Sequence, residues 1–172
     1  MVSLVVVLMS DLGCTTTPPL ISDIGDAVDR GAKKVVGAFD GRPLPPPQQS
    51  EEEAVTRARE AYEAGKLAYQ TADYLDALDH FREAFAAAEE IEDPELGRQV
   101  QSSLYYNLGS THLRAYDLDG DQTHLAQAKV LLQRYLDSDP ELTEEDRAQA
   151  NGLIQEANDE LAKARAEATS GS

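Results

Sequence analysis

The chain has 172 residues, and its composition favours close-packed helices over a β-sandwich. Hydrophobic residues make up 41%, but aromatic residues only 6%, and Trp is absent, so alanine supplies much of the apolar content. The formal net charge is −17, of which residues 51–172 carry −16 (11 bases minus 27 acids). A surface this acidic repels phosphate backbones, which argues against nucleic-acid partners.

The first 14 residues have the pattern of an export signal. Met1–Met9 is an apolar run that is too short to span a membrane but has the length of a signal-peptide core. Gly13 and Cys14 follow, and Cys14 is the one cysteine of the sequence. This segment resembles the end of a bacterial lipoprotein signal, which implies that Cys14 is lipidated and that the protein is anchored at the periplasmic side of the cell envelope. Asp11 occupies the position three residues before the cysteine, where lipoprotein signals usually have an aliphatic residue. The alternative is therefore that this is an ordinary N-terminal segment and that Cys14 is not modified.

Residues 15–50 are predicted to be a tether. Four prolines in the five positions Pro43–Pro47 favour extended polyproline II, which is a semi-rigid spacer. Leu20–Phe39 carries a weak helical stripe, but its three glycines disfavour a stable isolated helix, so we expect a transient one. The apolar stripe consists of Ile21, Ile24, Val28, Ala32, Val35 and Phe39.

Residues 51–168 are predicted to form an all-α domain, followed by a frayed tail over 169–172. Apolar and small residues recur at three and four positions through this region, which is the period of a helix with one buried face. A turn is expected over about Asp117–Gln122. Capping residues predict four helix starts: Ser50 with Glu53, Asp73, Asp93 with Pro94, and Thr143.

Two stretches carry a family resemblance. Asp73–Phe85 (DYLDALDHFREAF) and Tyr105–Gly109 (YYNLG) resemble the second and first helix of the tetratricopeptide repeat, and Ala128, Leu132 and Pro140 match later positions. The resemblance covers residues 58–140. It implies two antiparallel helix hairpins plus a C-terminal capping helix, arranged as an α-solenoid, with about seven extra residues around Tyr116–Thr123.

The resemblance also implies a role in holding other proteins. Members of the family bind peptides on a concave face lined by the first helix of each unit, so a non-enzymatic module with a protein or peptide partner is expected. A homo-oligomer is a further possibility, because two repeat units are fewer than a stable solenoid usually needs. The positions carried over to this face are Arg59, Tyr62, Lys66, Tyr69, Gln70, Ser103, Tyr106, Asn107 and Ser110.

Signs of chemistry are weak. No nucleophile elbow, phosphate loop or dinucleotide fingerprint appears, so no catalytic residue and no cofactor are predicted. Asp117–Asp121 lacks the glycine and glutamate positions of a calcium loop and is interpreted as a turn. His112 and His124 could approach each other near Asp119 or Asp121, but their spacing is not that of a zinc site, and no metal is predicted.

Two hypotheses about location follow. The first is a scaffold or adaptor that is tethered at the cell envelope through Cys14. The alternative is a cytoplasmic adaptor or secretion chaperone of the same fold that has no lipid anchor.

Overall fold

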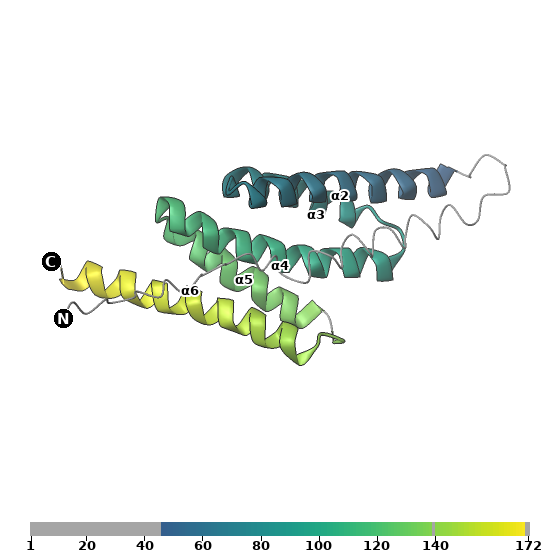
Figure 1. The fold of residues 1–172 in the computed structure, drawn as a ribbon. Helices are drawn as coiled ribbons and strands as arrows, with labels where there is room; N and C mark the ends of the chain where they lie inside the picture. Colours follow the sequence, from purple (N-terminus) through teal and green to yellow (C-terminus); the bar gives the residue numbers. More distant parts are fainter. Residues whose placement is uncertain (1–45, 139, 171–172) are drawn as a thin grey trace, which may run out of the picture.

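The computed structural model describes residues 46–138 and 140–170, which form five helices and, within those ranges, no strand. Each helix packs against the next one in the chain, so the helices follow one another across the molecule from α2 to α6 (Figure 1). The all-α prediction is confirmed. Cys14, the predicted signal segment 1–14 and tether residues 15–45 lie outside the described residues. The helices are α2 (Pro46–Gln70), α3 (Tyr74–Glu89), α4 (Pro94–Asp119), α5 (Gln122–Ser138) and α6 (Glu144–Ser170).

Local capping sets the starts of α3 and α6 where the sequence predicts them. The Asp73 carboxylate accepts a hydrogen bond from the backbone N–H of Asp76 at 3.3 Å. At the start of α6, the Thr143 hydroxyl oxygen accepts from the N–H of Asp146 at 3.1 Å, while the Asp146 carboxylate accepts from the Thr143 hydroxyl at 2.6 Å. Each bond satisfies a backbone donor that the first helical turn leaves without an intrahelical partner.

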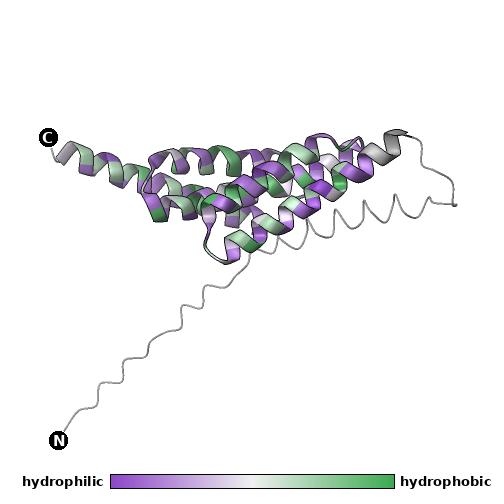
Figure 2. Ribbon diagram, turned by 90° about the horizontal axis from the view of Figure 1, so that it is seen from above, coloured by the Kyte–Doolittle hydropathy of each residue, from purple (hydrophilic) through white to green (hydrophobic). Residues whose placement is uncertain are grey.

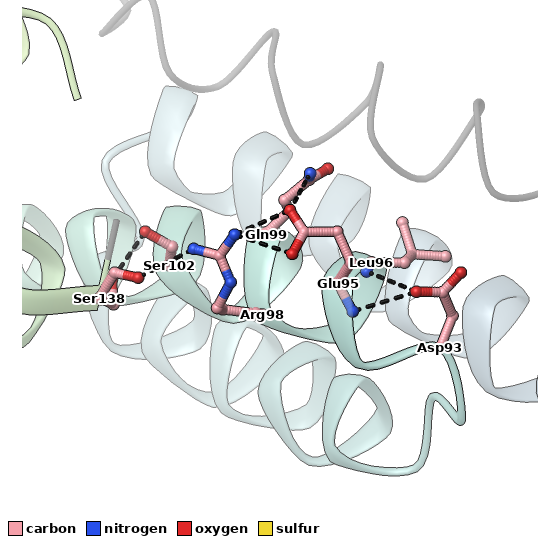
Figure 3. Close-up of polar contacts among 7 residues, drawn as sticks. All are labelled: Asp93, Glu95, Leu96, Arg98, Gln99, Ser102 and Ser138. Carbon is pink, nitrogen blue, oxygen red and sulfur yellow. Dashed lines mark hydrogen bonds and ion pairs between the residues drawn. The ribbon is translucent and has the colours of Figure 1, made fainter. Parts of the chain in front are cut away.

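The start of α4 is also confirmed, and α4 in turn holds the end of α5 (Figure 3). The Asp93 carboxylate accepts from the two N–H groups that follow Pro94, at 3.0 and 3.2 Å. Further along α4, the Arg98 guanidinium donates to the carbonyl oxygen of Ser138 at 3.1 Å, and the Ser138 hydroxyl bonds that of Ser102 at 2.8 Å. The last carbonyl of α5 therefore has a charged donor.

The helices extend a few residues beyond the predicted helical region at both ends. Helix α2 begins at Pro46, so residues 46–50 are helical and do not belong to an extended spacer, and Ser50 is not the start. Proline is tolerated in the first helical turn because the N–H that it lacks would have no partner there. Helix α6 runs to Ser170, so Thr169 and Ser170 are helical and not part of a frayed tail.

The turn between α4 and α5 is shorter than predicted. Helix α4 continues to Asp119, and Gly120 ends it in a left-handed conformation (φ 71°), with its N–H donating to the carbonyl of Tyr116 at 2.8 Å. Asp121 starts α5, since its carboxylate accepts from the N–H of Thr123 at 2.9 Å. The extra residues predicted as a loop between these helices therefore lengthen the helices, and Asp119 and Asp121 act in capping.

Two glycines let neighbouring helices approach closely. A Cβ added to Gly65 of α2 would lie 2.7 Å from the ring of Phe81 on α3. A Cβ added to Gly109 of α4 would lie 2.7 Å from Cγ of Leu132 on α5. Both contacts are below van der Waals separation, and both Phe81 and Leu132 are buried. The same device therefore closes the α2–α3 pair and the α4–α5 pair.

Hydrophobic and hydrophilic residues alternate along each helix (Figure 2), and most of the apolar ones that are buried belong to contacts between helices. Two core clusters result, one shared mainly by α2, α3 and α4, the other by α4, α5 and α6. Among the described helices, none combines the length and the apolar content needed to cross a membrane.

Candidate partner-binding surfaces

Four of the nine residues predicted to line a concave binding face are buried between helices. Tyr62 and Tyr106 are each 1% exposed, Asn107 is 2% exposed and Ser110 is 7% exposed. A partner could not touch these four side chains unless the helices moved apart. As direct contacts they are therefore removed from the candidate set.

Both tyrosines pack in the core. The Tyr62 ring lies against Phe81, with 5.9 Å between centroids, and the Tyr106 ring meets Tyr135 edge-on at 5.3 Å. Burial raises the pKa of the Tyr106 hydroxyl, and the neighbouring Tyr69 adds to this effect. Aromatic pairs of this geometry stabilise a core beyond the area that they bury, so these tyrosines hold the helices together.

Hydrogen bonds within α4 occupy the buried polar groups. The Asn107 side-chain amide donates to the carbonyl of Ser103 at 3.0 Å. The backbone carbonyl of Asn107 accepts from the hydroxyls of Ser110 at 3.0 Å and Thr111 at 2.6 Å. Bonds of this kind let Ser, Thr and Asn sit inside a buried helix without an unsatisfied polar atom. Asn107 is therefore engaged with its own helix.

The other five predicted residues stay at least partly exposed. Lys66 reaches the carboxylate of Glu63 at 3.3 Å, and Tyr69 meets Tyr74 edge-on at 5.4 Å between centroids. Arg114 of α4 lies near this region and contacts Glu156 of α6 at 3.6 Å. The five predicted residues that stay at least partly exposed are Arg59, Lys66, Tyr69, Gln70 and Ser103.

A groove that the sequence interpretation missed runs between α3 and α5, over α4. Its first part has a volume of about 350 Å³ and an apolar floor that includes Phe85, Tyr105 and Leu131. The rings of Phe85 and Tyr105 pack at a tilt with 5.0 Å between their centroids, and the Arg134 guanidinium lies 5.9 Å from the centroid of the Tyr105 ring. The other lining residues are Arg82, Ala86, Glu89 and Leu108.

The groove continues toward the turn between α4 and α5. This second part, of about 380 Å³, shares Arg82, Leu108 and Leu131 with the first, so the two form one surface feature. Arg82 and Arg134 stand on opposite walls, and both are exposed. Arg82 contacts Asp79 at 2.8 Å, but exposed ion pairs of this kind contribute only about 0–1 kcal/mol, so the Arg82 head can exchange partners. In an acidic domain, this groove combines apolar surface with one exposed arginine on each wall, and Glu89 lies on the α3 wall as well.

Two histidines meet at the far end of this groove, as the sequence allowed. Nδ1 of His112 lies 2.8 Å from Nδ1 of His124, and Nε2 of His124 lies 3.2 Å from the Asp119 carboxylate. When His124 is neutral and donates a hydrogen bond from Nε2 to the Asp119 carboxylate, its Nδ1 accepts a hydrogen bond from Nδ1 of His112. Burial, then the neighbouring His124 and Arg82, lower the pKa of His112 to about 4. His112 is therefore neutral near pH 7.

The sequence pattern could not separate groove residues from core residues. Phe85, Tyr105 and Leu131 fall on the helical stripes that also supply the core, and only the spacing between α3 and α5 leaves them partly open. One signal was available, because Arg82 and Arg134 lie one helical turn from apolar residues in an otherwise acidic region.

Within residues 46–138 and 140–170, no group of three or more His, Cys, Asp or Glu side chains is placed to hold a metal ion. Comparisons with family models, with curated proteins and with solved structures found no match for this chain.

Proposed function

We propose that this protein is a non-enzymatic protein-interaction module of tetratricopeptide-like architecture, in which the groove between α3 and α5 receives a protein segment. The observation that carries the proposal is this groove, in which exposed cations flank partly open aromatic and aliphatic side chains. Tyr and Arg, together with Trp, are enriched at the energetic centres of interfaces. Apolar side chains of a partner would displace water from the floor of the groove, and polar or acidic groups of the partner would contact Arg82 and Arg134.

The repeat-like architecture is supported by the two matched glycine contacts. Gly65 against Phe81 and Gly109 against Leu132 close two successive helix pairs in the same way. Helix α6 packs mainly on α5 and covers the end of the second pair, as a capping helix would. Modules built in this way use surfaces that several helices share, which suits the binding of a peptide rather than chemistry at one residue.

Matched charge reversals test where the partner binds. The groove variant is Arg82→Glu with Arg134→Glu, and the tagged full chain serves as bait in cell lysate with quantitative mass spectrometry. We expect specific proteins to be captured by the wild type and to fall about tenfold with the groove variant, the change that a loss of ~1.4 kcal/mol produces. Since both arginines are exposed, the fold should be unaffected, which circular dichroism checks.

Two further variants change the net charge by the same amount and serve as comparisons. Lys163→Glu with Arg165→Glu alters the exposed end of α6 and should leave capture unchanged. Arg59→Glu with Lys66→Glu alters the face first predicted from the sequence. Loss of capture with this pair alone would place the partner on α2, and failure of the wild type to enrich any protein over all three variants would refute the proposed function.

We propose in addition that the module is tethered at the bacterial cell envelope through a lipid on Cys14. The support is the sequence of residues 1–14, and a lipid there would concentrate a captured partner near the membrane. We expect radiolabelled palmitate to be incorporated into the wild type and lost entirely from Cys14→Ser. Incorporation that survives Cys14→Ser, or an unlabelled soluble protein with an intact Met1, would favour the cytoplasmic adaptor instead.

A further inference from the structure

The groove between α3 and α5 has a charge pattern that a stretch of the chain's own sequence complements. Arg134, on the α5 wall, is level with Phe85 of α3, because both contact the ring of Tyr105. Glu89, on the α3 wall, lies four residues beyond Phe85, or about 6 Å further along that helix. Arg134 and Glu89 therefore place a cation on one wall and, one turn later, an anion on the other, while Arg82 lies on the α3 wall before Phe85.

Residues 20–39 carry the opposite charges at nearly the same spacing. In helical geometry the apolar side chains Ile24, Val28 and Val35 share one face. Asp29 flanks one side of this face, and Lys34 flanks the other, five residues or about 7.5 Å further along. With the apolar face on the groove floor, Asp29 lies opposite Arg134 when Lys34 lies opposite Glu89.

The path of the chain agrees with this arrangement. A segment placed with Lys34 near Glu89 runs parallel to α3 and ends at the C-terminal end of α3. That end lies beside α2, since Glu90 pairs with Arg57 and the Glu51 carboxylate accepts from the N–H of Asp93. Residues 40–45 then connect to Pro46, and six residues reach about 20 Å when extended.

We propose that residues 20–39 of the same chain occupy this groove and compete there with the external partner. The inference rests on the proposed function, because it concerns regulation of the same site. A tethered segment acts at an effective concentration on the order of mM, so weak docking is enough to cover the groove. An external partner then binds only as the segment leaves.

A spin label on the segment tests the proposal in the full chain. Cys14→Ser removes the natural thiol, Ser22→Cys accepts a nitroxide, and amide spectra are recorded before and after reduction of the label. We expect the oxidised label to broaden the amides of Leu108, Gln127 and Leu131, which line the groove. Broadening confined to the α2 and α6 surfaces, or no broadening, would overturn the docking.

Charge exchange adds a specific control. Arg134→Glu should abolish the broadening, and Asp29→Arg in the same chain should restore it, whereas Arg165→Glu on the exposed end of α6 should change nothing. A mixture of isotope-labelled chain without nitroxide and unlabelled chain with nitroxide reports contact between copies. Broadening in that mixture would show that the segment of a second copy fills the groove and would overturn the intramolecular proposal. The capture experiment with the groove variants tests the proposed function independently of this spin-label experiment, so one proposal can fail while the other holds.

Discussion

Replacing Gly109 by Val should lower the free energy of unfolding by about 3 kcal/mol, and replacing it by Ala should lower it by roughly 1–2 kcal/mol. The added Cβ would lie 2.7 Å from Cγ of Leu132 and 3.3 Å from the backbone carbonyl oxygen of Ala128, so α4 and α5 would have to separate. The helix-forming preference of Ala offsets part of this cost, by about 1 kcal/mol. Chemical denaturation followed by circular dichroism measures the change.

Gly152 provides a matched control on α6. A Cβ at this exposed helical position meets nothing within 4 Å, so Gly152→Ala has only the gain in helix preference and should raise stability by about 0.5–1 kcal/mol. Opposite signs for the same substitution in two helices would separate packing from propensity. Equal effects at Gly109 and Gly152 would show that the close contact of α4 with α5 is wrong.

A second substitution checks that Leu132 is the contact responsible. Leu132→Ala alone should cost about 2–5 kcal/mol because it leaves a cavity in a fully buried site. In the Gly109→Ala background the new methyl group fills part of that space, so the two costs should fall short of additivity by about 1 kcal/mol or more. Strict additivity would contradict direct contact between the two positions.

The starts of α3, α4 and α6 were predictable from the sequence because their causes are local. The carboxylates of Asp73 and Asp93 and the hydroxyl of Thr143 bond N–H groups only two or three residues away. The end of α4 was equally local but was misjudged. Asp117–Asp119 have the composition of a turn, yet the helix ends only where Gly120 adopts a positive φ. The glycine, and not the aspartates, marked the boundary.

The candidate surfaces were less predictable, because exposure depends on how neighbouring helices are placed. Tyr62 and Tyr105 both lie on helices and neighbour small or apolar residues, yet Tyr62 is in the core and Tyr105 in the groove. The periodicity within one helix predicts on which side of the helix a residue lies. It does not predict how wide the gap is between that side and the neighbouring helix. That gap between α3 and α5 determines which aromatic side chains a partner can reach.

Stability should fall as the pH drops from about 6.5 toward 4, in the window set by His112. Its pKa is about 4 in the folded protein, against 6.5 when unperturbed, because the side chain is buried and lies against His124 and near Arg82. The unfolded chain therefore binds the proton first, and the stability present above pH 6.5 is lost progressively on acidification. The gap of about 2.5 units between the two pKa values corresponds to at most roughly 3–4 kcal/mol.

His112→Gln should flatten this dependence, at the cost of about 1 kcal/mol near pH 7 for the lost hydrogen bond to His124. Urea denaturation at pH values between about 7 and 4.5 measures the slope, with His80→Gln on the outer face of α3 as the control. Glu90 and Glu95, whose pKa values Arg57 and Arg98 lower from 4.5, lose their contribution mainly below about pH 4.5, which is the acid end of this window and the lower limit of the measurement. An unchanged slope in His112→Gln would therefore show that the buried histidine pair does not control the acid sensitivity of the domain.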